Sequence, residues 1–282
     1  MKQIRVFLLV LTVMVFFSAV HAQSNEPLAI LMTADGTIMP PMLEYFKRGI
    51  KTAEQRNAEV LVIQLNTPGG SVSVMSEMIT AIGNSTVPVV IYVSPKDAQA
   101  ASAGALITMA GHASAMSPRT VIGAASPIDS SGADIESTLE KKIKEDLKAK
   151  ARTLVERRGL QSIQLAEAMI DDAKAVTATE ALEAKLIDFI SDDTEDLLQS
   201  LNGFTVQMDS GSHTFNTTDV RTQDLNISFI EQLLLMLTDP NIAFLLLAIG
   251  VQGVLIEISS PGGWFAGFIG ATCLTLAVYG MG

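Results

Sequence analysis

The stretch that decides the fold is VLVIQLNTPGG, residues 60–70, in which a run of large apolar residues ends in a proline and two glycines. The apolar run predicts a buried strand, and Gly69-Gly70 predicts a turn into a helix over about 72–83. Similar strand and helix patterns precede and follow this stretch. Strands that alternate with helices pair in parallel through right-handed crossovers, so the sequence predicts an α/β fold with ligands near the carboxyl ends of its strands.

Short apolar runs and amphipathic stretches alternate through the middle of the chain. The runs predict strands, and the last two of them are expected to continue the same sheet. The predicted strands are 28–32, 60–65, 89–93, 113–116 and 121–122. The predicted helices are 41–56, 72–83, one that begins near Ser102, 137–158, 162–170 and 177–188. A hairpin is expected over 203–217, with its turn at Asp209-Ser210-Gly211-Ser212.

Both ends of the chain are apolar, which accounts for a hydrophobic content of 48% in 282 residues. The start has the basic residues, the apolar stretch and the small exit residues of a secretory signal peptide, with a retained anchor as the alternative. Residues 241–258 and 262–282 predict two membrane helices. The signal peptide predicts that residues 23 to about 240 lie outside the cytoplasm, on the periplasmic or extracellular side of the inner or plasma membrane.

A short segment joins the middle of the chain to the membrane helices. Its apolar residues are interrupted by Glu231 and Gln232, which predicts a helix at the membrane interface, with a packed helix as the alternative. The expected organisation is a signal peptide at 1–22, an α/β domain at 23–220, an interfacial or linker helix at 221–240 and transmembrane helices at 241–282. We expect the full-length protein to continue beyond Gly282.

Charge and cysteine content exclude several classes of function. The net charge of −11 at pH 7 argues against a nucleic-acid binder. The single cysteine, Cys273, lies in the last apolar span, so neither an intrachain disulfide nor a thiol nucleophile is expected. We expect no metal and no cofactor, and the lipid bilayer is an expected partner.

Ser102 is the candidate nucleophile, because it lies among small residues at the end of a predicted strand, in Ala100-Ala101-Ser102-Ala103-Gly104. His112 follows in what reads as one helix, roughly 15 Å away at 1.5 Å per residue. His213 lies in the polar hairpin. A Ser-His-Asp triad is therefore disfavoured, and a lysine becomes a base only if an apolar pocket lowers its pKa.

The candidate lysines lie on the helix predicted from residue 137. Its apolar stripe is formed by Leu139, Ile143, Leu147, Ala151 and Leu154. At 100° per residue Lys141 points away from this stripe, whereas Lys142 and Lys144 flank it, so both remain candidates. The N–H groups of the Gly69-Gly70 turn and of Ala103 are candidate donors to a developing oxyanion.

Three motifs, at residues 66–70, 100–104 and 122–127, together resemble the NfeD family of membrane-bound serine proteases. These are partners of stomatin-like proteins and relatives of the Clp protease and signal peptide peptidase A. The helix at 140–146 resembles the lysine-bearing helix of the family, and counting back from Arg158-Gly159 places the catalytic lysine on Lys142. Residues 254–262 resemble the first membrane segments of the family.

The resemblance implies a Clp/crotonase-like fold, with Ser102 as the nucleophile and Lys142 as the general base. Gly70 and Ala103 would form the oxyanion hole, and Pro68 and Gly69 would contact the substrate. The implied substrates are apolar segments of membrane-associated proteins, stomatin-like partners among them. Clp and crotonase relatives self-associate, so a homo-oligomer is expected by analogy.

Two classes of function remain after these steps. The first is a membrane-anchored extracytoplasmic serine endopeptidase with a Ser-Lys dyad. The alternative is a non-catalytic assembly or scaffold partner of stomatin-like proteins that uses the same fold. Signal peptide peptidase activity is a third option, but that family has a different membrane topology.

Overall fold

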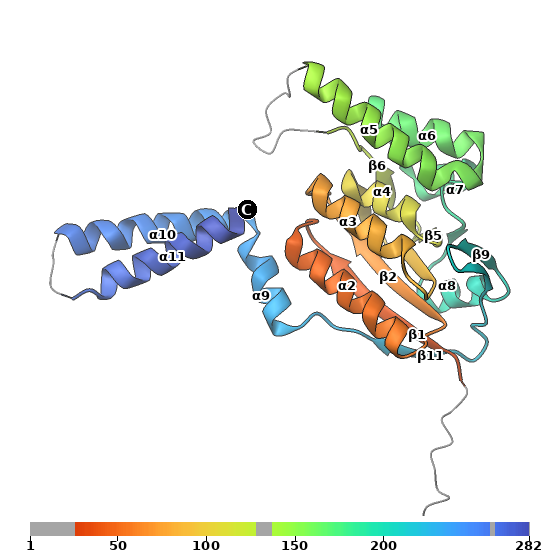
Figure 1. Cartoon of the computed structure of the whole chain (residues 1–282), viewed down its shortest axis with the longest axis horizontal. Helices are drawn as coiled ribbons and strands as arrows, with labels where there is room; N and C mark the ends of the chain where they lie inside the picture. Colours follow the sequence, from red (N-terminus) through yellow and green to blue (C-terminus); the bar gives the residue numbers. More distant parts are fainter. Residues whose placement is uncertain (1–25, 128–136, 260–262, 282) are drawn as a thin grey trace, which may run out of the picture.

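The computed structural model of the chain describes residues 26–127, 137–259 and 263–281 (Figure 1). Its centre is a six-stranded parallel sheet in the order β11-β1-β2-β3-β5-β8. These strands are β1 (Leu28–Asp35), β2 (Val60–Asn66), β3 (Val89–Val93), β5 (Ala113–Met116), β8 (Phe189–Ile190) and β11 (Arg221–Asp224). The predicted α/β class with a parallel sheet is confirmed.

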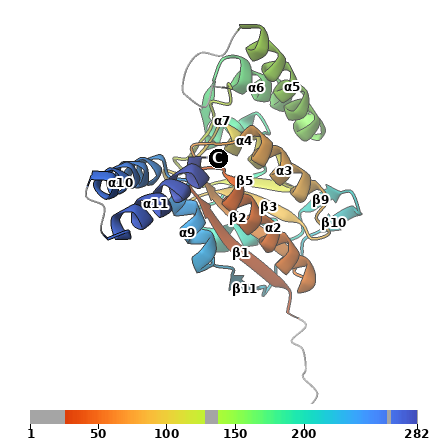
Figure 2. The ribbon, with the colours of Figure 1, turned by 60° about the vertical axis from the view of Figure 1, so that its left-hand side comes forward.

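Three helices cover one face of this sheet (Figures 1 and 2). They are α2 (Pro40–Gln55), α3 (Val72–Gly83) and α4 (Ala103–Ala110), which connect successive strands. Because the strand order advances in one direction, right-handed crossovers place all three helices on the same face. The other face is covered by α8 (Thr194–Leu201) and by the hairpin of β9 (Thr205–Met208) and β10 (Gly211–Thr214), which confirms the predicted hairpin.

Strand β2 shows how the sequence divides between the two faces. Leu61, Ile63 and Leu65 belong to the core under α2, α3 and α4, whereas Val60 and Val62 belong to the smaller core under α8. Successive side chains of a strand point to opposite faces, so a strand that is buried on both sides needs an unbroken apolar run. This requirement explains the run that opens the motif at 60–70.

A second sheet of three short strands carries the chain beyond the carboxyl edge of the main sheet. It consists of β4 (Gln99–Ala101), β6 (Val121–Gly123) and β7 (Ala175–Thr177), with β6 in the middle. The prediction that 121–122 continues the main sheet is therefore wrong. β6 instead pairs in parallel with β4 and antiparallel with β7. Helix α7 (Ala178–Glu183) follows β7 and begins with the capping box of Thr177 and Glu180.

The main sheet extends past the predicted domain boundary at residue 220. Strand β11 pairs in parallel with the first half of β1, from Leu28↔Arg221 to Leu31↔Asp224. The segment 221–240 is thus not a helix or linker throughout, because its first residues complete the α/β domain. Arg221-Thr222-Gln223-Asp224 contains no apolar residue, which is why the sequence pattern did not indicate a strand.

A further helical layer packs over α4. It contains α5 (Ser137–Val155), the short 3₁₀ helix η1 (Glu156–Arg158) and α6 (Leu160–Asp171). The second half of α5 is well packed, with Leu147 and Ala151 buried. The first half is not, and Leu139 is 51% exposed. Figure 1 shows the beginning of α5 reaching beyond α4.

The last three helices are α9 (Phe229–Leu237), α10 (Pro240–Ser259) and α11 (Phe265–Met281). α10 and α11 pack as an antiparallel hairpin, closely enough that a methyl group on Gly253 would lie 2.8 Å from the carbonyl oxygen of Ala266. Among the described residues, α10 is the helix that is long and apolar enough to cross a membrane, and α11 is a shorter apolar helix. Glu257 accepts hydrogen bonds from the N–H groups of Trp264 at 2.9 Å and Gly267 at 3.1 Å, so this acidic side chain caps the start of α11.

His112 belongs to the core of the α/β domain. It follows α4, is buried, and its Nδ1 accepts a hydrogen bond from the N–H of Val89 at 3.0 Å. Burial, together with the nearby positive charge of Arg157, lowers the pKa of His112 from 6.5 to about 4. His112 is therefore neutral when it makes this bond, in its role as a structural acceptor.

We expect the domain to lose stability in mild acid. The unfolded chain takes up a proton at His112 near pH 6.5 and the folded chain only near pH 4, so the stabilisation is complete above about pH 6.5 and declines as the pH falls toward 4. The loss of unfolding free energy across this window should be on the order of 2 to 3 kcal/mol. Chemical denaturation of the wild type and of His112→Asn, whose amide oxygen retains the acceptor, measures it. The same pH dependence in both proteins would contradict this assignment.

Candidate active site

Ser102 occupies a sharp turn between β4 and α4. Its backbone has φ 52° and ψ −119°, on the side of the backbone map that side-chain-bearing residues rarely adopt. Such a conformation costs about 1 to 3 kcal/mol and persists only where the surroundings enforce it. The enforcing contact is a hydrogen bond of 2.8 Å from the Ser102 N–H to the carbonyl of Gly123 in β6. The second sheet thereby holds the serine at the tip of the turn.

The side chain of Ser102 is half-buried and available for chemistry. Among the residues that the structure describes, its hydroxyl makes no hydrogen bond, and it does not cap α4. A serine at a strand-to-helix turn presents its hydroxyl away from the backbone on both sides, which is the geometry of nucleophiles in several hydrolase folds.

The glycine turn after β2 lies directly against this serine. Gly69 has φ 112°, and a methyl group on it would lie 2.6 Å from Cβ of Ser102 and 3.1 Å from Oγ. Only a residue without a side chain fits between the two turns. The structure thus brings Gly69 and Ser102 into contact, as expected for a site built from these two motifs, while Pro68 is exposed at the outside of the turn.

Thr67 ties the two turns together. It is fully buried, its N–H donates to the carbonyl of Gln99 at 2.7 Å, and its carbonyl accepts from the N–H of Ala101 at 3.0 Å. Its hydroxyl oxygen accepts from the N–H of Gly69 at 3.0 Å. A methyl group on Gly104 would lie 2.5 Å from the Thr67 side chain. The small residues around Ser102 are therefore required by this close approach.

Two backbone donors lie beside the serine. Gly70, with φ 156°, is held in a bridge in which Ile38 donates to the carbonyl of Gly69 at 2.8 Å and Ser71 donates to the carbonyl of Ile38 at 2.9 Å. Within the described ranges, the N–H groups of Gly70 and of Ala103, the first residue of α4, donate no hydrogen bond. Free N–H groups next to a serine are the donors that a developing oxyanion needs.

Lys142 lies in the first half of α5, where its side chain is exposed. An apolar enclosure of this amine, expected for a general base, is absent from the described part of the single chain. The reason is that α5 begins beyond the edge of α4, so the stripe residues Leu139 and Ile143 are not fully covered. The other candidate, Lys144, is paired with Glu140 at 2.8 Å.

Neither His112 nor His213 is placed to serve Ser102. His112 is committed to the N–H of Val89, and Nε2 of His213 lies 3.1 Å from Oε1 of Glu59 at the hairpin. In the described structure, these two histidines therefore form no Ser-His-Asp triad with Ser102. Thr67 and Gly123 are the positioning residues that the sequence analysis missed. The only signal for Gly123 was its place in the motif at 122–127.

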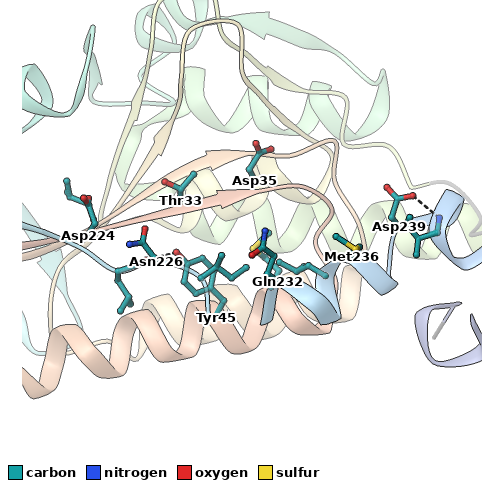
Figure 3. A pocket seen from close by; sticks show the side chains of 14 residues that line it. Thr33, Asp35, Tyr45, Asp224, Asn226, Gln232, Met236 and Asp239 are labelled. Carbon is teal, nitrogen blue, oxygen red and sulfur yellow. Dashed lines mark hydrogen bonds between the residues drawn. The ribbon is translucent and has the colours of Figure 1, made fainter. Parts of the chain in front are cut away.

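A cavity of about 730 Å³ lies elsewhere, between β1, α2 and α9 (Figure 3). It is lined by Thr33 and Asp35 of β1, by Tyr45 of α2 and by residues of α9, and it includes no residue of the Ser102 turn. Tyr45 donates from its hydroxyl to the carbonyl of Leu225 at 2.6 Å, just after β11 ends. Burial raises the pKa of Tyr45, so this hydroxyl stays protonated.

Two protein-family models match the chain. Residues 31–210 match the one described as NfeD1b, N-terminal domain, and residues 241–282 match the one described as NfeD integral membrane domain. The second match indicates a membrane location.

Two curated relatives align along nearly the whole chain. The membrane-bound protease PH1510 of Pyrococcus horikoshii is 34% identical over 283 residues, which cover 99% of this chain and 63% of that protein. The membrane protein NfeD1b of Bacillus subtilis is 24% identical over 92% of this chain and 57% of that protein. The chain thus spans about three fifths of the length of these relatives.

Solved structures of the 1510-N membrane-bound stomatin-specific protease are similar in fold. A variant with a lysine replaced by alanine, in complex with a substrate peptide, superposes with a TM-score of 0.71 at 33% identity, over 76% of this chain and 99% of that one. A variant with a serine replaced by alanine gives a TM-score of 0.68 at 33% identity, over 72% of this chain and all of that one. The predicted α/β fold with a parallel sheet is thus shared with these solved structures. With sequence models matched over 31–210 and 241–282, the chain belongs to the NfeD family.

Proposed function

We propose that this chain is a membrane-anchored serine peptidase in which Ser102 is the nucleophile and Lys142 the general base. The observation that carries the proposal is the strained turn of Ser102, held by Gly123 and packed against Gly69. Such strain is retained where a fold over-determines a functional residue. The protease names of the relatives support the same reading, as do the serine and lysine variants among the solved structures.

The proposed reaction has two stages. Oγ of Ser102 attacks the carbonyl carbon of the scissile peptide bond, while the amine of Lys142 takes the hydroxyl proton and passes it to the leaving amine. The N–H groups of Gly70 and Ala103 bind the oxyanion, and Pro68 and Gly69 contact the substrate backbone. Water then hydrolyses the acyl-enzyme ester and releases Ser102.

The exposed position of Lys142 adds a condition to this mechanism. A protonated amine in water is no base, so the first half of α5 must be covered in the active state. We propose that self-association of the chain supplies the cover, because Leu139 and Ile143 flank Lys142 and leave apolar surface to bury.

The proposed substrates are apolar segments of membrane-associated proteins, stomatin-like proteins among them, by analogy with the stomatin-specific relative. The proposed location is the extracytoplasmic side of the membrane. The exposure of Lys142 is also the observation that favours the alternative function, a non-catalytic scaffold that binds stomatin-like partners.

Labelling with a fluorophosphonate probe separates the two functions. We expect wild-type protein in detergent to be labelled and Ser102→Ala to be unlabelled. Lys142→Ala and Lys142→Arg should lose peptidase turnover by about 10²- to 10⁴-fold, because neither side chain accepts a proton. Lys141→Ala, an exposed neighbour on the same helix, is the matched control and should retain activity. Turnover by Lys142→Arg would exclude Lys142 as the base, and an unlabelled wild type would favour the scaffold.

A second prediction concerns the contact between the two turns. Gly69→Ala should lower turnover by about 10²-fold, because the methyl group displaces Ser102 and an error of about 1 Å in position is that costly. Stability should fall by about 1 to 3 kcal/mol from the strained backbone. Gly159→Ala is the control, since Gly159 has φ 99° and no atom within 4 Å of the added methyl group. Equal activity in the two variants would show that the contact is not needed for catalysis.

A further inference from the structure

Helix α9 leaves most of one apolar face uncovered. Phe229 and Ile230 are 78% and 68% exposed, and Leu233 on the same face is 46% exposed, whereas Met236 at its edge lines the cavity of Figure 3. At 100° per residue the side chains of Phe229, Ile230 and Leu233 fall within about one third of the helix circumference. Burying a large apolar side chain contributes about 1.5 to 3 kcal/mol, so a contiguous face of this kind marks a surface that is covered in the working protein.

The opposite face of α9 is fastened to the α/β domain. Arg48 of α2 donates to Glu231 from Nε at 2.8 Å and from Nη2 at 2.6 Å, and Glu231 is only 13% exposed. The pKa of Glu231 falls to about 2, chiefly because of these bonds. Leu235, one turn later, packs against the main core. The side of α9 that faces the domain is thus occupied.

The uncovered face continues into the membrane hairpin. Leu237 falls on that face but is buried, and a side chain on Gly280 of α11 would overlap its carbonyl. Only Thr238 and Asp239 separate α9 from the membrane helix α10. Figure 1 shows α9 running across the direction of the α10–α11 hairpin, at the end nearest the domain.

We infer that α9 lies along the membrane surface, with Phe229, Ile230 and Leu233 inserted among the lipid headgroups and upper acyl chains. A helix that crosses a spanning hairpin at its end lies in the plane of the membrane, and a bilayer around the hairpin meets this face first. Its other face carries the α/β domain through Arg48 and Glu231. The occupant of the face is therefore the bilayer rather than a second copy of the chain.

The charge of the chain indicates which lipids α9 needs for insertion. With a net charge of −11 the protein gains nothing overall from anionic headgroups, so insertion rests on apolar burial. Helix α9 should therefore insert equally into vesicles of phosphatidylcholine alone and into vesicles that also contain phosphatidylglycerol.

Fluorescence quenching in vesicles tests this position with the full chain. In a Cys273→Ser background, Ile230→Cys and Gln232→Cys are each labelled with bimane and reconstituted in phosphatidylcholine. Gln232 is exposed on α9 but lines the cavity of Figure 3, so it is the matched control. Nitroxide lipids, labelled near the headgroup, should quench the Ile230→Cys label several-fold more than the control label. Aqueous iodide should quench the control label more strongly.

Two results would overturn the inference. The first is equal quenching of both labels by iodide with no effect of nitroxide lipid, which would place the face in water. The second is a disulfide-linked dimer of the unlabelled Ile230→Cys chain together with a label that neither quencher reaches, which would place a second copy there. Both readouts are independent of catalysis, so failure of the proposed peptidase activity would leave this test intact.

Discussion

The approach of Gly69 to Ser102 is the constraint around which the candidate site is arranged. One turn ends a strand of the main sheet and the other begins α4, and they meet with no room for a methyl group between them. Thr67 fixes their separation through its bonds to Gln99 and Ala101, and Gly104 lets α4 come close enough for those bonds to form. The small residues of both motifs are thus a requirement of packing before they are a requirement of chemistry.

The two residues of the proposed dyad lie on parts of the fold that differ in how firmly they are packed. Ser102 is held by two sheets, whereas Lys142 projects from the uncovered first half of α5. In the proposed function, the serine is already held in place and the lysine still needs a cover, so the proposed activity depends on self-association. Proton transfer then becomes possible only where water has been removed from one helix turn.

Local patterns in the sequence were enough to predict the centre of the fold. The run at 60–65 and the helix at 72–83 were predicted because an apolar strand and a glycine turn are local signals. The contact partners of β4, β6 and β11 were not predictable, because short strands of small or polar residues are defined by distant neighbours. At the site, the motifs around Gly69 and Ser102 were found. The strained backbone of Ser102 depends on its hydrogen bond to Gly123, and the exposure of Lys142 depends on how α5 packs over α4. Both are contacts between residues that are far apart in the sequence. The roles of all the predicted site residues remain predictions, namely Ser102, Lys142, Gly70, Ala103, Pro68 and Gly69.

Tyr45 lies beside the part of the sheet edge that β11 leaves uncovered. Strand β11 covers only the first four residues of β1, so within the described residues no strand lies beside Met32 to Asp35 on that side. Open sheet edges are templates on which other chains polymerise. Here the hydroxyl of Tyr45 donates to the carbonyl of Leu225, just after β11 ends, and α9 lies over the gap. Because the bonds between Arg48 and Glu231 hold α9 against the domain, the protein itself shields this edge from aggregation, with or without lipid.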